Sequence, residues 1–485
     1  MVDALAAPLI FEQGQPGRAN TYFPHHEEDA GAYLPEAALR DELPLPDNSE
    51  LDVVRHFTRL SQRSFGIDTG FYPLGSCTMK YNPRINDAMA SLPGLRDLHP
   101  FVPDDLAQGA LAIMWELERA LASLFGMAAF SLNPAAGAQG ELAALLISKA
   151  YFRKRGETRR MTVIVPDTAH GTNPASAAMV GYKVISLQSD ERGRVDPATL
   201  RGAVGDGTAV CMMTNPNTLG LFEDSIAEIA EIVHAAGGLM YYDGANANAL
   251  MGNSRPGDMG FDLMHLNLHK TFSIPHGGGG AGAGPLGVAK HLVEFLPVPV
   301  VRERDGIYSL DFNLPSTIGP MRSFWSNFAH MVRALAYVCA NGADGLTRVS
   351  QLAVLNANYV KAKIKDVLEI PYDEPCRHEF VASAQALKRE TGVRALDIAK
   401  ALLDRGYHAP TMYFPLLVPE CLMIEPTETE SKETLDGFIA ALRDVIEQAH
   451  ADPAATHQAP QQTPVSRVDE TRAAREPDLR WQPKA

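Results

Sequence analysis

The sequence predicts an α/β protein with a large domain on a mostly parallel sheet and a smaller α/β domain towards the C-terminus. Short apolar segments alternate with helical patterns in the middle of the chain, which is typical of parallel strands covered by helices on both faces. The chain has 485 residues, more than a single domain usually contains. A change to shorter units near residue 320 places the domains at 61–325 and 326–450, between an arm (1–60) and a tail (451–485).

The composition indicates a cytoplasmic enzyme. The 43 basic and 58 acidic residues give a net charge of −15, which argues against nucleic acid or an anionic membrane as the main partner. The five cysteines are scattered and form no Cys-x-x-Cys pair, so neither a disulfide framework nor a metal site is predicted. The N-terminus lacks the features of a signal peptide or an organellar presequence, and no apolar run is long enough to span a bilayer.

The two ends of the chain differ from the domains in composition. Residues 1–60 are rich in proline and charge, so we expect an extended arm. This arm carries too many apolar side chains for a freely solvated segment: Phe11, Tyr22, Phe23, Tyr33 and Leu34. Residues 451–485 combine several prolines with mixed charge, and composition alone predicts a linker or tail.

The large domain begins with a loop, a helix and a candidate anion site. Residues 70–84 have loop composition, and helical spacing of apolar residues follows over 105–127. A turn of small residues at 137–140 then opens a second helix, whose unpaired amide groups and positive dipole end can hold phosphate. Small residues at a helix start also serve close packing, so this pattern is weak on its own.

Four apolar runs then predict strands at 161–165, 183–187, 209–213 and 239–243. A helix before the last of them is expected to begin at a capping box of Ser225 and Glu228 and to stop at Gly237. The next strand alternates with a period of two, Met264, Leu266 and Leu268 against His265, Asn267 and His269.

Lys270 follows that strand and precedes a glycine-rich segment at 277–284. A lysine that a buried strand delivers into such a turn is desolvated, which frees its amine to act as a nucleophile. The alternative interpretation is a surface lysine before a flexible loop. The polar residues that follow the other predicted strands favour the interpretation of Lys270 as a nucleophile.

Polar residues stand at the carboxyl ends of these strands, where ligands collect in parallel sheets. They are His170, Asn217 with its neighbour Thr214, Asp243 and Lys270. Each has an ordinary structural explanation when taken alone, His170 as a core histidine, Asn217 as a turn former and Asp243 as a helix cap. Their coincidence at one edge of the sheet favours a site.

The C-terminal domain is predicted from helical patterns and short strands. Two helices are expected, through Phe324 to Val338 and from Leu346 to Val367. The units that follow are strands at 378–381, 411–415 and 422–426 and a helix at 395–403. The last helix is expected to open at a capping box of Thr427 and Glu430 and to run to about His450.

The candidate groups meet the requirements of pyridoxal 5'-phosphate, which needs an amine, a phosphate site, a carboxylate at its pyridine nitrogen and a flat group over its ring. The candidates are Lys270, the turn at 137–140, Asp243 and His170, with Asn217 or Thr214 for the ring hydroxyl. Their order along the chain is consistent with the aspartate-aminotransferase-like fold of pyridoxal-phosphate-dependent transferases, which makes 61–325 the cofactor-binding domain.

Six stretches resemble the glycine cleavage system P-protein, the decarboxylating glycine dehydrogenase: 71–80, 133–141, 169–175, 214–220, 242–246 and 265–270. The resemblance covers nearly the whole chain, including the arm and the tail segment 463–469. The chain is about half as long as the one-chain form of that family and is similar to the catalytic second subunit of its two-subunit bacterial form. The tail is therefore expected to dock on the assembly.

The resemblance implies an oxidoreductase of glycine catabolism that decarboxylates glycine through an aldimine of pyridoxal 5'-phosphate and transfers the aminomethyl group to the lipoyl arm of H-protein. It implies catalytic roles for Lys270, His269 and His170. The cofactor-binding set is Lys270, Asp243, His170, Gly137, Ala138, Gln139, Asn217 and Ala245. Gln139 departs from the family, since some relatives have histidine there, which puts a direct role for its side chain in doubt.

The resemblance also implies partners, namely subunit 1, lipoylated H-protein and a functional link to T-protein and dihydrolipoyl dehydrogenase. Arg84, Arg302 and Arg304 are candidate contacts for H-protein. Two alternatives stay open: another enzyme of the same fold, such as an aminotransferase or cysteine desulfurase, and a non-catalytic scaffold subunit. The glycine-rich segment has no cysteine for a desulfurase, and a scaffold has no use for Lys270 or Asp243.

Overall fold

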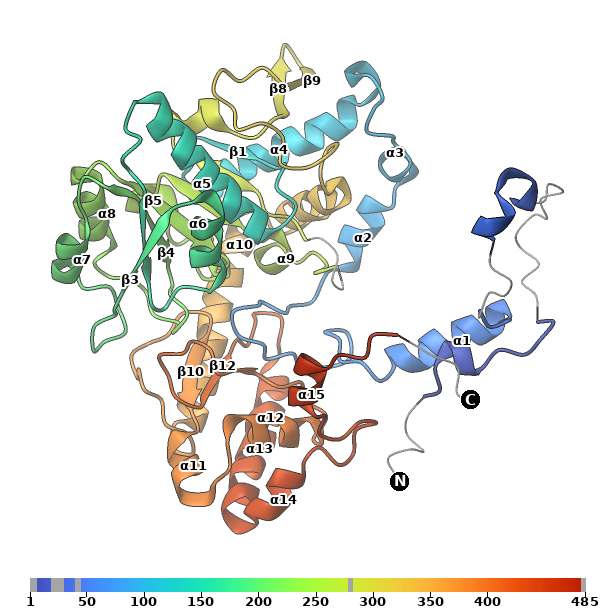
Figure 1. The fold of residues 1–485 in the computed structure, drawn as a ribbon. Coiled ribbons are helices and arrows are strands. Elements are labelled where there is room, and N and C mark those ends of the chain that lie inside the picture. Colours follow the sequence, from blue (N-terminus) through green and yellow to red (C-terminus); the bar gives the residue numbers. More distant parts are fainter. Residues whose placement is uncertain (1–6, 19–29, 40–44, 278–281, 481–485) are drawn as a thin grey trace. The chain divides into compact units, whose positions relative to one another are not determined.

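A computed structural model describes residues 7–18, 30–39, 45–277 and 282–480 of the chain (Figure 1). The chain divides into two compact units, one formed by residues up to Gly70 together with those from Gln458 onward, and the other by Phe71–His457. No helix within the described residues combines the length and the apolar character needed to cross a membrane.

The smaller unit contains short helical segments: η2 (Ile10–Glu12), η3 (Ala30–Tyr33), η4 (Glu36–Ala38), α1 (Glu50–Ser61) and α15 (Glu470–Arg475). Helix α1 begins at Ser49, whose hydroxyl accepts a hydrogen bond from the Asp52 amide at 3.2 Å. The stretch predicted as an extended arm thus ends in a helix. Tyr22 and Phe23 lie outside the described residues, and docking of the tail stays a prediction.

A seven-stranded sheet forms the centre of the larger unit. Its strands are β1 (Ala129–Ser131), β2 (Thr162–Pro166), β3 (Lys183–Leu187), β4 (Thr208–Thr214), β5 (Leu239–Gly244), β6 (Leu263–Leu266) and β7 (Leu286–Val288). Their order is β1-β7-β6-β5-β4-β2-β3. The pairs from β3 through β6 are parallel, and only β7 runs antiparallel to its neighbours. The predicted mostly parallel α/β fold is confirmed.

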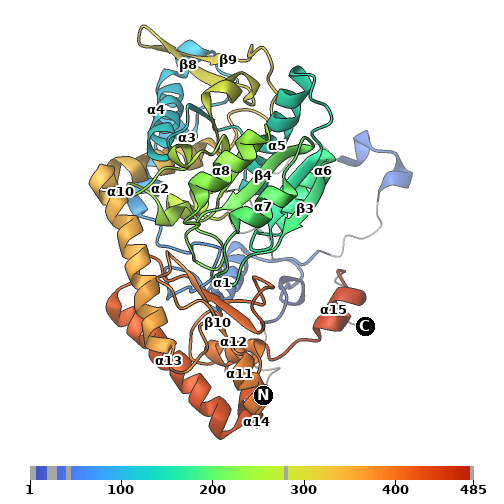
Figure 2. The same cartoon turned by 90° about the vertical axis from the view of Figure 1, so that its left-hand side faces the viewer.

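Helices cover both faces of this sheet, as Figures 1 and 2 show. The principal ones are α4 (Gln108–Phe125), α5 (Gly137–Lys154), α6 (Thr172–Val180), α7 (Pro197–Ala203) and α8 (Ile226–Ala235). Successive residues of a strand face opposite sides of the sheet. Val163 and Val165 pack with α5 and α6, whereas Ile164 packs with α4 and α8. Burial on both sides explains why the inner strands β2, β4 and β5 are largely apolar instead of alternating with polar residues, whereas the edge strand β3 is mostly exposed.

Shorter elements connect the main ones. They are α2 (Arg84–Ala90), α3 (Pro93–Arg96), η5 (Asp104–Leu106), η6 (Ala247–Ala249), η7 (Pro256–Met259), η8 (Lys290–Phe295) and the antiparallel pair β8 (Val300–Arg304) and β9 (Ile307–Asp311).

The C-terminal part of the larger unit is a small α/β domain. Its antiparallel sheet has the order β10 (Phe380–Ser383), β12 (Cys421–Ile424) and β11 (Thr411–Met412). Its helices are α11 (Gln385–Thr391), α12 (Ala395–Leu403), α13 (Lys432–Ala451) and α14 (Pro453–Gln458). Helix α10 (Phe328–Ile364) leads into it and is interrupted at Gly342, where φ is 62° and ψ is −175°. The two predicted helices are therefore the two halves of α10.

Three local predictions are wrong. Strand β6 ends at Leu266, and Lys270 lies in the short helix α9 (Leu268–Thr271) instead of at a strand end. Ser225 precedes α8 but makes no capping hydrogen bond with its side chain. Helix α13 is capped by Ser431, which accepts from the Thr434 amide at 3.2 Å, and not by Thr427.

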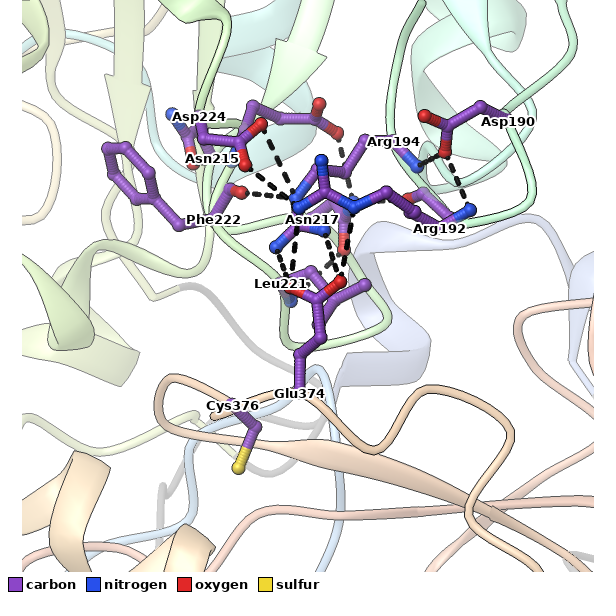
Figure 3. A network of polar contacts seen from close by, with 12 residues as sticks. Asp190, Arg192, Arg194, Asn215, Asn217, Leu221, Phe222, Asp224, Glu374 and Cys376 are labelled. Carbon is purple, nitrogen blue, oxygen red and sulfur yellow. Dashed lines mark hydrogen bonds and ion pairs between the residues drawn. The ribbon is translucent and has the colours of Figure 1, made fainter.

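A polar cluster joins the small domain to the loop after β3 (Figure 3). Glu374 accepts hydrogen bonds from Arg194 at 2.8 Å and from Arg192 at 3.2 Å. Arg194 and then Arg192 lower the pKa of Glu374 to about 2. Arg194 also donates to the carbonyl oxygen of Phe222 at 2.8 Å, so a single side chain connects three segments.

Candidate active site

Lys270 is oriented by the loop that precedes α2. Its Nζ atom donates a hydrogen bond to the carbonyl oxygen of Ser76 at 2.7 Å. Ser76 has a left-handed backbone with φ of 59°, which is uncommon for a residue other than glycine. Its amide donates to Glu379 at 2.6 Å. The backbone of one residue, Ser76, therefore links the lysine to a buried carboxylate of the small domain.

Asp243 lies at the end of β5, beside the strand that leads to Lys270. Its side chain is only 2% exposed and accepts hydrogen bonds from Asn173 at 2.9 Å and from the Ala245 amide at 3.0 Å. His265 Nε2 lies 3.5 Å from its Oδ1 atom. Burial raises the pKa of Asp243, but His265, the Ala245 amide and Asn173 outweigh that effect and hold it below its ordinary value. Asp243 is thus a buried carboxylate that stays ionised at neutral pH.

Glycine at the start of α5 lets this helix approach β6 closely. A Cβ atom on Gly137 would lie 2.1 Å from Asn267 Oδ1, and one on Gly140 would lie 2.8 Å from the Cβ of His265. Only glycine fits at this approach. The first-turn amides of α5, which include those of Gly137, Ala138 and Gln139, have no helical carbonyl partner and are therefore available to an anion.

The side chain of Gln139 is already engaged. Its Oε1 accepts from the Ala135 amide at 2.6 Å, and its Nε2 donates to the carbonyl oxygen of Met321 at 2.9 Å. Asn133 reinforces the same junction by accepting from the Met321 amide at 2.6 Å. The side chain of Gln139 therefore holds two loops together, and its candidate contribution to an anion site is its backbone amide.

The side chain of Asn217 is likewise engaged in hydrogen bonds, whereas the hydroxyl of Thr214 has no partner among the described residues. The Asn217 amide group donates to Gly193 and Glu223, both at 2.9 Å, and its oxygen accepts from two amides of its own loop (Figure 3). Thr214 lies opposite Asp243 in the register of β4 and β5, and its buried hydroxyl has no partner among the described residues. Of the two candidates for the ring hydroxyl, Thr214 is the one with a free polar atom.

His170 lies in the loop between β2 and α6, three residues before Asn173, which binds Asp243. Its Nδ1 atom is 3.0 Å from the Thr172 hydroxyl and 3.3 Å from the Thr172 amide. Its ring meets Phe414 of the small domain edge to face, with centroids 5.5 Å apart. These contacts fix the ring near the carboxylate.

His269 is the residue before Lys270 in α9. Its Nδ1 atom accepts from the Ala283 amide at 3.4 Å, and a Cβ atom on Gly282 would lie 2.0 Å from that nitrogen. Its ring meets His276 at a centroid distance of 5.3 Å. Burial, then His276 and Lys270, lower the pKa of His269 to about 3, so the imidazole is neutral.

Several buried groups near Lys270 were missed by the sequence analysis, namely Glu141, Asn173, His265, Glu379 and Glu425. Burial raises the pKa of Glu379 to about 7, and burial and then Glu379 raise that of Glu425. Within the described part of the chain, His378, Glu379 and Glu425 are the one group of three metal-type ligands within 4.8 Å. Both oxygens of Glu379 already accept hydrogen bonds, from Ser76 and Asn246, which favours a shared proton over a metal ion. The adjacent residues His378 and Glu379 at an apolar strand are the sequence feature that could have indicated this buried group.

Comparison with known proteins agrees with this fold. An aminotransferase class-V family profile matches residues 106–296, and one for the glycine dehydrogenase C-terminal domain matches 349–467. The crystal structure of an inhibitor-bound glycine decarboxylase (P-protein) of the glycine cleavage system superposes with a TM-score of 0.72, covering 85% of this chain and 93% of that one. At 22% identity, this likeness shows the fold.

Fold and site together define the class, an α/β protein of the pyridoxal-phosphate-dependent transferase fold. A probable glycine dehydrogenase (decarboxylating) subunit 2 from Caldanaerobacter subterraneus is 55% identical over 477 residues, which are 98% of each chain. One of the same name from Pyrococcus abyssi is 54% identical, covering 98% of this chain and 95% of that one. The chain belongs to the family of glycine dehydrogenase (decarboxylating) subunit 2.

Proposed function

We propose that this chain is the catalytic subunit that decarboxylates glycine with pyridoxal 5'-phosphate and passes the aminomethyl group to the lipoyl arm of H-protein. The observation that carries the proposal is that Lys270, in α9 directly after β6, interacts electrostatically with the buried, ionised Asp243 at the carboxyl end of the adjacent strand β5. Relatives more than 50% identical over nearly the full chain are named for the same activity.

The residues at this edge fit the cofactor group by group. The first-turn amides of α5 suit its phosphate, Asp243 suits its pyridine nitrogen, and the unpartnered hydroxyl of Thr214 suits its ring oxygen. We infer that His170, held by Thr172, would lie against its ring and that Lys270 would supply the amine that holds it. When bound, the cofactor takes up the electron pair that is released as carbon dioxide leaves.

The chain's own residues supply charge and proton control. Asp243 holds a proton on the pyridine nitrogen because its carboxylate is ionised and fixed by Asn173 and Ala245. The Ser76 carbonyl orients Nζ of Lys270, which can hold or release a proton when it is free of the cofactor. The neutral imidazole of His269 accepts from the Ala283 amide at Nδ1, so its proton is on Nε2, which can act as a hydrogen-bond donor beside the lysine.

The proposal includes subunit 1 and lipoylated H-protein as partners, with T-protein and dihydrolipoyl dehydrogenase acting downstream, in the cytoplasm. Subunit 1 is supported by the names of the relatives, which are those of a second subunit. Arg304 is exposed and suits an acidic partner, whereas Arg302 is paired with Asp311 at 3.1 Å.

The test is exchange of labelled bicarbonate into the carboxyl group of glycine, with this chain, subunit 1, pyridoxal 5'-phosphate and lipoylated H-protein. Exchange is expected with the complete mixture and should fall to background with Lys270→Ala. The exposed lysine variant Lys290→Ala is the matched control and should retain full exchange. Full exchange with Lys270→Ala would refute the assignment of the catalytic lysine. Transamination without exchange would indicate an aminotransferase instead.

A further inference from the structure

A cavity of about 430 Å³ lies outside the candidate active site and is lined by residues from four segments. The segments are the loop after β4, the stretch from η6 towards η7, the second half of α10 and the residues before β10. A cavity of this volume suits a small organic molecule. Its polar or aromatic lining residues are Phe222, Asn253, Ser254, Ser350, Gln351 and Arg377.

Arg377 brings to this cavity a cation without a counter-charge. Its side chain is partly buried, and its Nε atom is buried without a hydrogen-bond partner. The guanidinium carbon lies 5.1 Å from the centroid of the Phe222 ring. The chain has 58 acidic and 43 basic residues, yet no carboxylate among the described residues forms an ion pair with Arg377. Because arginine stays charged at physiological pH, this group is open to an anion.

Two further side chains of the lining can donate hydrogen bonds to an anion. The hydroxyl of Ser254 and the amide of Gln351 form no hydrogen bond with the residues that the structure describes. Ser350, in contrast, donates its hydroxyl proton to the Asn248 carbonyl at 2.7 Å and belongs to the framework. The available donors therefore come from the stretch after η6, from α10 and from the segment before β10.

The walls of the cavity are held in place by contacts between these segments. The amide of Arg377 donates to the Gly220 carbonyl at 2.7 Å, which fixes the segment before β10 to the loop after β4. The carbonyl of Phe222 is held by Arg194 in the polar cluster of Figure 3. The stretch after η6 lies directly against α10, because a Cβ atom on Gly252 would lie 1.9 Å from a side-chain oxygen of that helix. The cavity is thus formed before any ligand enters.

We propose that this cavity binds a small organic molecule with a carboxylate or phosphate group, and that Arg377 holds that group. Both kinds of oxyanion match the planar pairs of N–H donors that arginine presents. Ser254 and Gln351 supply further hydrogen bonds, and the ring of Phe222 offers apolar surface to the rest of the molecule. Such a ligand contacts both domains, since Ser254 precedes β6 of the large sheet and Arg377 precedes β10 of the small one.

The experiment is isothermal titration calorimetry of the full chain reconstituted with pyridoxal 5'-phosphate, so that the first turn of α5 is not free to bind the probe. The probes are inorganic phosphate and benzoate, titrated separately to show which oxyanion the cavity takes. We expect one-to-one binding of at least one probe with a Kd of about 1 mM or lower. The absence of saturable binding of both probes would overturn the proposal.

Matched variants assign the binding to this cavity. Arg377→Gln should weaken it by at least about tenfold, the effect of losing one charged hydrogen bond. Gln351→Glu, at an exposed position, adds a carboxylate to the lining and should weaken it similarly, so it decides the question if Arg377→Gln does not fold. Arg389→Gln, at an exposed position of α11, is the control and should bind as wild type does.

Binding that survives in both cavity variants would lie elsewhere on the chain and would refute the proposal. The heat of binding is measured without catalysis. Failure of glycine exchange would therefore refute the proposed function and leave this site standing.

Discussion

Thr214 and Asp243 lie opposite each other at the carboxyl ends of the adjacent parallel strands β4 and β5. Both are buried, yet Asp243 has two hydrogen-bond donors and Thr214 has none among the described residues. A buried hydroxyl without a partner is costly, so its presence beside a fixed carboxylate suits a ligand that supplies the missing hydrogen bond. This pair is the basis of the first prediction.

Replacing Asp243 with Asn should lower the exchange rate by about 10²- to 10³-fold, the range for losing one preorganised charge-stabilising group. The amide keeps the size of the side chain but removes the negative charge that holds a proton on the pyridine nitrogen. The measurement is bicarbonate exchange, together with the absorption spectrum of the bound cofactor. Asp206→Asn, at an exposed position, is the control. A wild-type rate in Asp243→Asn would show that the carboxylate does not act on the cofactor.

The start of α5 gives a prediction about packing. Gly137→Ala places a methyl group 2.1 Å from Asn267 Oδ1, so either the buried Asn267 side chain or the start of α5 must shift. We expect the free energy of unfolding to fall by about 1–3 kcal/mol, as for other overpacked cores, and cofactor affinity to fall as well. Urea unfolding and cofactor titration measure the two effects.

Gly109→Ala is the matched control for that experiment, because a Cβ atom at this helical position meets nothing within 4 Å. Alanine there should raise the stability of α4 by about 0.5–1 kcal/mol. Equal behaviour of the two variants would mean that the close approach of α5 to β6 has no energetic consequence.

The contact between Glu374 and the two arginines predicts a pH-dependent term in stability (Figure 3). The folded-state pKa of Glu374 is about 2, below the ordinary value of 4.5, so its contribution is present above pH 4.5 and is lost as the pH falls towards 2. Because the carboxylate is partly exposed, with 41% of its side chain accessible, we expect Glu374→Ala to cost no more than about 1 kcal/mol at neutral pH, and less at high salt.

Urea unfolding of wild type and Glu374→Ala at several pH values would measure this term. The difference between the two proteins should narrow as the pH falls below 4.5. A difference that widens on acidification would contradict the assigned direction of the pKa shift. Lys432→Ala, which removes an exposed ion pair with Asp436 on α13, provides a surface control.

Regular elements could be predicted from the sequence where one pattern decides the structure. Strand β3 and helix α12 match their predicted bounds because short apolar runs and helical spacing are local properties. The end of β6 could not be predicted in this way. Alternation continues through His269, but the backbone turns at Asn267, where the side chain meets Gly137 from a distant part of the sequence.

The candidate site could be predicted only in part, for a similar reason. Lys270, Asp243 and the turn before α5 follow strands or open a helix, so the topology of a parallel sheet brings them together. The role of Asn217 in its own loop and the burial of Glu141 depend on side chains that pack from other segments. The sequence shows their identities but not their neighbours.

The backbone of Ser76 is also where the small domain and the reactive lysine become mechanically connected. Leu74 pairs with Ile424 of β12, the Thr411 hydroxyl donates to the Gly75 carbonyl at 2.7 Å, and the Ser76 amide binds Glu379. The carbonyl of the same residue positions Lys270. Any displacement of the small domain relative to the large sheet would therefore be transmitted to the lysine amine through a single residue, without involving helix α9, which carries the lysine.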